Sequence, residues 1–144
     1  MPKPYRLSAK DLVMFAREAR SKAYAPYSKF KVGAALLAKN GQVYLGCNVE
    51  NASFGLTCCA ERNAVFKAVS DGQREFKAIA IHSDSPEPTA PCGACRQVLS
   101  EFSPGMLVIM AGARGMVKSR KLKELLPNCF GPKSLKTFNS HQGT

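Results

Sequence analysis

Residues 76–82 read Phe-Lys-Ala-Ile-Ala-Ile-His, a short and mostly apolar run. Such a run is typical of a buried strand at the centre of a sheet. On its N-terminal side, residues 59–70 repeat alanine at helical spacing, and the following Gly72 suits a helix C-cap. On its C-terminal side, two prolines mark a loop over 83–90, and residues 93–102 predict a second helix.

The N-terminal part predicts a further helix and a hairpin. A helix over about 8–24 begins at Ser8, whose spacing to Asp11 resembles a capping box, and ends at Pro26. Asn40-Gly41 is the strongest short hairpin signal, because both residue types tolerate positive φ. The strands on either side of this turn are residues 30–38 and 42–48.

The C-terminal part predicts two more strands, over 107–110 and through about Ser119. The connection at 111–114 is too short for a crossover, and parallel pairing needs about a dozen connecting residues, so these strands pair antiparallel. A short helix over 121–126 ends at Pro127. The order of elements implies an α/β fold with three layers.

Length and composition predict one domain over 1–144, with residues from about 139 to 144 as a disordered tail. No run of about 18 apolar residues predicts a membrane span. Residues 1–6 lack the apolar stretch of a secretory signal. We therefore expect a cytoplasmic protein. For its six cysteines we favour metal ligands or nucleophiles over disulfides.

The net charge of +11 is unevenly distributed. Residues 1–39 and 111–144 are strongly basic, whereas residues 40–110 carry seven acidic and five basic side chains. The basic flanks fit either a nucleic-acid footprint or a solvated surface with a basic bias. We favour the second interpretation, because net charge speaks to solubility and steering rather than to a specific site.

Two cysteine motifs carry the chemistry: Cys59-Ala60-Glu61 and Pro91-Cys92-Gly93-Ala94-Cys95, each at a predicted helix start. Cys92 and Cys95 can reach one metal from a single turn, and a third thiolate leaves the fourth tetrahedral position open, as in catalytic zinc sites. Spacing alone does not decide between Cys58 and Cys59 as the third ligand. The alternatives are buried thiols or a redox pair. Cys47 and Cys129 are interpreted as packing residues.

Two neighbours of these thiols are candidates for further roles. Glu61 can act as general acid and base beside the open position, although a first-turn glutamate is also favoured by the helix dipole. Arg62 can donate to cysteine sulfurs, with a surface ion pair as the alternative.

Several longer stretches accompany these motifs. They are Tyr24-Ala25-Pro26-Tyr27-Ser28 with Phe30, Val32-Gly33-Ala34-Ala35-Leu36, Gly46-Cys47-Asn48-Val49-Glu50-Asn51-Ala52, Cys59-Ala60-Glu61-Arg62, Pro91-Cys92-Gly93-Ala94-Cys95-Arg96-Gln97, Glu124-Leu125-Leu126-Pro127 and Phe130-Gly131-Pro132. With these stretches the chain, from about Tyr24 to Pro132, closely resembles the small homotetrameric cytidine deaminases of pyrimidine salvage.

The resemblance implies a three-layer α-β-α, cytidine deaminase-like fold with a mixed five-stranded sheet. It implies hydrolysis of cytidine and 2′-deoxycytidine to uridine and 2′-deoxyuridine with release of ammonia. It also selects Cys59, with Cys92 and Cys95, as ligand of one Zn²⁺ per subunit. Glu61 is then the catalytic acid and base, and Arg62 hydrogen-bonds the thiolates.

The resemblance also assigns a substrate site. Asn48 and Glu50 correspond to residues that contact the sugar, and backbone groups of Ala60 and Ala90 to positions that bind the base. Three aromatic residues lie near the substrate, the last of them contributed by a neighbouring subunit of the tetramer: Tyr27, Phe30 and Phe130. Without the resemblance, these three would be interpreted as core.

Two features depart from the family pattern. The basic stretch over 112–121 replaces a neutral or acidic turn, and Cys58 replaces an aliphatic residue. Three rival functions remain: a polynucleotide deaminase, a non-enzymatic zinc module that binds nucleic acid, and a deaminase of a cytosine-like antibiotic. Cys-x-Glu in place of His-x-Glu and the antiparallel last strands disfavour the first, and the sugar-binding pair disfavours the last.

Overall fold

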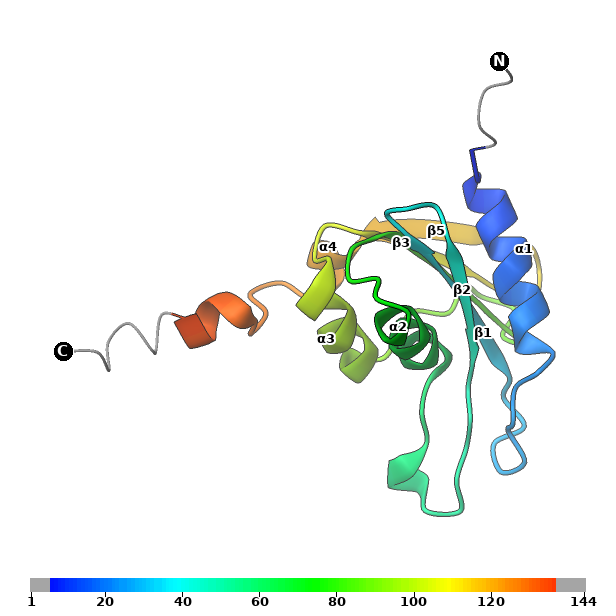
Figure 1. The fold of residues 1–144 in the computed structure, drawn as a ribbon. Helices are drawn as coiled ribbons and strands as arrows, with labels where there is room; N and C mark the ends of the chain where they lie inside the picture. Colours follow the sequence, from blue (N-terminus) through cyan, green and yellow to red (C-terminus); the bar gives the residue numbers. More distant parts are fainter. Residues whose placement is uncertain (1–5, 137–144) are drawn as a thin grey trace.

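The computed structural model describes residues 6–136 and shows an α/β fold in three layers (Figure 1). The predicted disordered tail lies outside the described residues. Residues 132–136 are helical and end the described part. The named elements are α1 (Ala9–Arg20), β1 (Val32–Ala38), β2 (Val43–Cys47), a 3-10 turn (Phe54–Leu56), α2 (Ala60–Ser70), β3 (Phe76–Ser83), α3 (Gly93–Phe102), β4 (Leu107–Ala111), β5 (Val117–Lys121) and α4 (Leu122–Leu125).

The five strands form one mixed sheet in the order β2-β1-β3-β4-β5. β3 pairs parallel with β4, and the other neighbours pair antiparallel. The predicted central strand and the antiparallel last pair are thus confirmed. The alanine, isoleucine and histidine run of β3 is buried on both faces of the sheet, as its lack of polar alternation predicts.

Each face of the sheet has its own apolar core. On one face α1 packs through Leu12 and Ala16 against Ala35, Ala80 and Ile109. On the other face, side chains of α2, α3 and α4 pack against the opposite side of β1, β3 and β4. Figure 1 shows α1 on one side of the sheet and α2 and α3 on the other.

Helix α1 begins as predicted but ends earlier. The Ser8 hydroxyl accepts from the Asp11 N–H, and the Asp11 carboxylate accepts from the Ser8 N–H, which completes the capping box. The helix ends at Arg20 rather than near residue 24. Tyr24 is drawn into an extended bridge with Val49, so the chain must leave the helix before it reaches Pro26.

The hairpin between β1 and β2 forms, but its turn differs from the prediction. The Gly41 N–H donates to Ala38 O at 3.0 Å, and Gly41 has φ of +93°. Asn40 is not in the positive-φ region. Lys39 and Asn40 therefore occupy the centre of the turn, and only the glycine supplies the left-handed residue of a three-residue loop.

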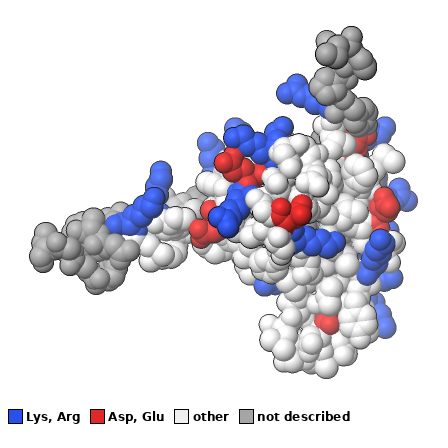
Figure 2. All heavy atoms as spheres, viewed as in Figure 1, with Lys and Arg blue, Asp and Glu red and all other residues white. Residues whose placement is uncertain are grey.

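Strand β5 is longer than predicted and runs to Lys121. Its five residues are all exposed, and it forms one edge of the sheet. The basic departure from the family pattern therefore lies in the β4–β5 turn and in this edge strand. Basic side chains gather around β5 and α4 and along α1 (Figure 2). Among the described residues, none of the helices is both long and apolar enough to cross a bilayer.

Candidate active site

Three cysteine thiols meet where α2 and α3 begin. The sulfur atoms of Cys59, Cys92 and Cys95 all lie within 4.8 Å of one another. The Cys59–Cys92 and Cys92–Cys95 sulfur distances are 3.7 Å and 3.5 Å. A tetrahedral centre with Zn–S bonds of about 2.3 Å has sulfur–sulfur edges of roughly 3.8 Å. The three sulfurs thus fit three corners of a zinc site and leave its fourth corner open.

The helix starts explain why these thiols are available. Cys59 and Cys92 are the N-cap residues of α2 and α3, and neither side chain makes a capping hydrogen bond. Cys95 is buried one turn into α3. The positive ends of the two helix dipoles favour thiolates here. A hydrogen bond with Cys95, aided by Arg62, lowers the pKa of Cys59 below its ordinary value.

The position of Cys58 resolves the choice between the adjacent thiols. Cys58 exchanges two backbone hydrogen bonds with Val49, each of 3.0 Å. Side chains alternate along an extended chain, so Cys58 and Cys59 point to opposite sides. Cys59 joins the sulfur cluster, whereas Cys58 does not. Of the predicted packing cysteines, Cys47 is half-buried and Cys129 is exposed, so Cys129 is not packed within this chain.

Arg62 lies beside the sulfur cluster rather than in a surface ion pair. One guanidinium nitrogen donates to Cys59 Sγ at 3.6 Å and to Thr57 O at 3.5 Å. The hydrogen bond to Cys59 raises the pKa of Arg62 further above its ordinary value. Among the described residues, Arg62 Nε is the buried side-chain atom without a partner. A spare donor next to the thiols suits a site built to hold several negative sulfurs.

The carboxyl group of Glu61 is buried at the same place. Glu61 is only 4% exposed and lies in hydrogen-bond contact with the Cys95 thiol. Burial raises the pKa of Glu61 to about 7. A carboxyl that gains and loses its proton near neutral pH has the property that a general acid and base requires.

A second group of residues surrounds a pocket of about 420 Å³ next to Thr57. Glu50 Oε1 accepts from the backbone N–H groups of Tyr27 and Ser28, at 3.0 Å and 3.1 Å, and the Ser28 hydroxyl donates to Oε2. The Ser28 hydrogen bond lowers the pKa of Glu50. Tyr27 and Phe54 form the pocket's aromatic wall, with ring centroids 5.8 Å apart.

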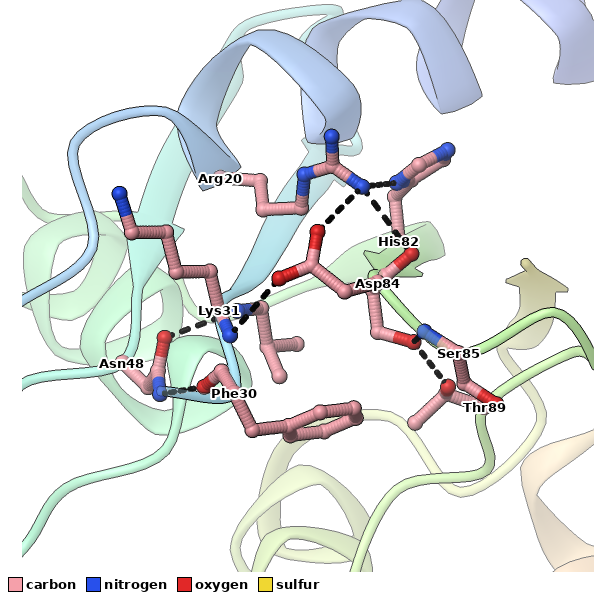
Figure 3. A network of polar contacts seen from close by, with 10 residues as sticks. Arg20, Phe30, Lys31, Asn48, His82, Asp84, Ser85 and Thr89 are labelled. Atoms are coloured by element: carbon pink, nitrogen blue, oxygen red, sulfur yellow. Dashed lines mark hydrogen bonds and ion pairs between the residues drawn. The ribbon is translucent and has the colours of Figure 1, made fainter. Parts of the chain in front are cut away.

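Asn48 is buried and partly engaged. Its Oδ1 accepts from the Val32 N–H and its Nδ2 donates to Phe30 O, both at 2.8 Å (Figure 3). These two hydrogen bonds hold the side chain in a fixed orientation. An asparagine amide has two donor hydrogens and two lone pairs, so one of each stays available for a ligand.

The remaining predicted residues are distributed around these groups. Ala60 is fully buried as the first residue of α2, and Ala90 is exposed in the loop before Pro91. Phe30 is partly exposed rather than core, as is Tyr27. Phe130 is 61% exposed on the segment that extends away from the body beyond α4 (Figure 1). The interpretation of the three aromatics as core is therefore wrong within this chain.

Three residues of the quoted stretches position the site, although the sequence alone assigns none of them a role. Ser28 orients Glu50, and Arg96 ties the site loop to α4 by donating to Pro91 O and Leu125 O at 2.8 Å each. A Cβ on Gly46 would lie 2.3 Å from Ala60 O, so α2 packs directly on the backbone of β2. A glycine inside a strand pattern signals such a close approach.

Comparison with known proteins agrees with this geometry. The family described as "Cytidine and deoxycytidylate deaminase zinc-binding region" matches residues 8–111. A cytidine deaminase of Sporosarcina psychrophila is 48% identical over 130 residues, 90% of this chain and 96% of that protein. A second, of Halalkalibacterium halodurans, is 51% identical over 83% of this chain and 91% of that protein. The crystal structure of cytidine deaminase from Burkholderia pseudomallei superimposes with a TM-score of 0.84 and 49% identity, covering 86% of this chain and 100% of that one.

Proposed function

Because this chain belongs to the cytidine and deoxycytidylate deaminase family, we propose that it hydrolyses cytidine and 2′-deoxycytidine to uridine and 2′-deoxyuridine with release of ammonia, a pyrimidine salvage reaction. The observation that carries the proposal is the buried Glu61 carboxyl in contact with a cluster of three thiols. The cluster supplies metal ligands, and the carboxyl supplies a proton carrier at the same place.

We assign one Zn²⁺ per subunit to Cys59, Cys92 and Cys95. When bound, zinc lowers the pKa of a water molecule and so supplies the hydroxide that attacks C4 of the ring. Arg62 offsets the negative charge of the sulfurs through its contact with Cys59. All six cysteines are free, which fits the reducing cytoplasm that we propose as the location.

Glu61 moves the protons. It takes one from the attacking water and delivers it to N3 of the ring, which makes C4 more electrophilic. It then takes the proton of the new hydroxyl on C4 and delivers it to the amino group, so that C4=O forms as ammonia leaves. Its burial and its pKa of about 7 support both roles, because the group changes protonation without a large free-energy cost at neutral pH.

The substrate is oriented by groups around this centre. We assign the sugar hydroxyls to Asn48, through its free amide capacity, and to Glu50, which Ser28 holds in place. Tyr27 and Phe30 flank the nucleoside, and backbone groups of Ala60 and Ala90 bind the base. Asn48 and Glu50 would bind the hydroxyl groups of the ribose ring. A nucleoside, which carries this ring, therefore suits the site better than a base alone.

The test of this function is the substitution Glu61→Gln, with the exposed Glu101→Gln as matched control. Ultraviolet absorbance follows the loss of cytidine. We expect Glu61→Gln to retain zinc and the folded circular dichroism spectrum but to lose roughly 10²–10⁴-fold in kcat, the usual contribution of a general acid and base. Near-normal turnover by Glu61→Gln would overturn the assignment.

We further propose a homotetramer in which a neighbour completes each site through Phe130. The loop over 50–58 carries Phe54 at 74% and Leu56 at 70% exposure, and the lower part of the molecule where it lies is mostly uncharged (Figure 2). Such exposed apolar groups mark contact surfaces.

Subunit mixing tests this assembly. Phe130→Ala and Glu61→Gln proteins are each expected to be weakly active, but a mixed tetramer pairs an intact Glu61 with an intact Phe130 from its neighbour. Activity should therefore rise on mixing after reversible dissociation. Sedimentation as a monomer, or no recovery in confirmed mixed tetramers, contradicts the proposal.

A further inference from the structure

A second pocket lies on the other face of the sheet from the cysteine cluster. Its volume is about 500 Å³, and it opens between α1 and the ends of β3, β4 and β5. Helix α1 covers this face, whereas the starts of α2 and α3, which carry the thiols, belong to the opposite layer (Figure 1). No residue assigned to deamination lines this pocket.

The pocket is positively charged. Lys10, Arg17 and Arg20 line it from α1, and no carboxylate does. Arg20 forms an ion pair of 3.0 Å with Asp84 and donates to Ser83 O at 3.1 Å. Within residues 6–136, neither Lys10 nor Arg17 has an ion-pair partner. Two cations are therefore available to a ligand, and the third, Arg20, is fixed by its contacts with Asp84 and Ser83.

His82 adds a ring N–H donor to the same pocket. It is only 7% exposed, and the Arg20 guanidinium lies 3.3 Å from its Nδ1 (Figure 3). A guanidinium only donates, so Nδ1 accepts, and the neutral ring carries its proton on Nε2. Burial and the nearby Arg20 and Arg17 lower the pKa of His82, which keeps the ring neutral.

The second ring nitrogen of His82 makes no hydrogen bond to a described residue. Figure 3 shows it pointing away from Arg20 and Asp84. His82 itself lines the pocket. Its Nε2–H is therefore available to donate to a ligand that enters the pocket. The pocket thus presents an available ring N–H together with two cations that have no ion-pair partner among residues 6–136.

We propose that this pocket binds a small phosphate ester with an apolar or aromatic group. The phosphate is held by Lys10 and Arg17 and by the Nε2–H of His82. The apolar group packs on the other walls, which are formed by Val13, Met14, Ala111 and Val117. The volume is in the range of small-ligand sites, which combine apolar walls with a few convergent polar groups.

The probe for the test is 1-naphthyl phosphate, with 1-naphthol and inorganic phosphate as its two halves. Isothermal titration calorimetry measures affinity for the full chain. Proton NMR follows the imidazole signals, which are simple to assign because the chain has only two histidines, His82 and His141. We expect the ester to shift the His82 signal and to bind at least tenfold more tightly than either half.

Two double variants separate a site from general attraction to a basic protein. Lys10→Gln with Arg17→Gln removes two pocket cations, and the exposed pair Arg74→Gln with Lys77→Gln removes the same charge elsewhere. We expect at least a tenfold loss of affinity in the first and none in the second, with deaminase activity retained in both. Equal affinity in the two variants, an unshifted His82 signal, or equally tight binding of 1-naphthol would overturn the proposal.

Discussion

The contact between Gly46 and α2 makes the position of the catalytic helix unusually sensitive to one methyl group. A Cβ on residue 46 would lie 2.3 Å from Ala60 O and 2.6 Å from Ala64 N, both backbone atoms. An ordinary contact begins at 3.4 Å, so the helix must move by about 1.1 Å to accept Gly46→Ala. Backbone cannot rotate away as a flexible side chain can.

This displacement falls on the first turn of α2, which carries Cys59 and Glu61. A misplacement of about 1 Å can lower a catalytic rate by roughly 100-fold. Overpacking of this kind also costs about 1–3 kcal/mol of stability. We therefore expect Gly46→Ala to lose more activity than its stability loss explains, because the protein stays folded at the assay temperature.

The assay combines cytidine turnover with thermal unfolding. Gly105→Ala is the matched control, since nothing lies within 4 Å of its added Cβ and its φ is not positive. The control should keep kcat within twofold. If Gly46→Ala has the kcat and Tm of the control, the close approach does not set the position of α2, and the reasoning fails.

Three further perturbations test other parts of the structure. Ser28→Ala removes the hydroxyl that donates to Glu50. We expect KM for cytidine to rise by roughly tenfold with kcat little changed. An unchanged KM would show that Glu50 does not bind the sugar. Removal of metal with a thiol-competent chelator should abolish turnover and lower Tm by at least about 5 °C, with both restored by Zn²⁺; a stripped protein of unchanged Tm would contradict a metal that bridges two helices. A hydrogen bond to Asp71 raises the pKa of Tyr44 from 10.0 to about 12, so its contribution to stability is full below pH 10 and is lost as pH rises through 12. Tyrosinate absorbance should show one late titration that Asp71→Asn shifts back towards 10; four tyrosines titrating together would refute it.

The sequence predicted best where one physical rule acts alone. The apolar run of β3 lacks the polar alternation of a half-exposed strand, so it predicts a buried strand. The link after β4 is so short that β5 can pair with β4 only in the antiparallel direction. Local rules failed where distant contacts intervened. The bridge between Tyr24 and Val49 ends α1 early, although nothing before Pro26 breaks the helical pattern.

The candidate site shows the same division. The Cys-x-x-Cys spacing predicts two sulfurs near one point, and the structure places Cys59 beside them. The orientation of Cys58 depends on its bridge to Val49, which spacing cannot reveal. The local sequence also could not predict that Phe30 and Phe130 are exposed, because an aromatic side chain fits a core and a contact surface equally well.

The edge strand β5 has a consequence for how copies of this protein behave at high concentration. An edge offers unpaired N–H and C=O groups to any strand that approaches, and unprotected edges polymerise. Pairing of two such edges would bring the cationic side chains of Lys118, Arg120 and Lys121 from both copies close together. Paired strands lie about 4.8 Å apart, within the roughly 8 Å Debye length of physiological salt, so this repulsion is scarcely screened. The basic side chains of β5 therefore oppose edge-to-edge pairing of two copies, and concentrated salt should weaken this repulsion.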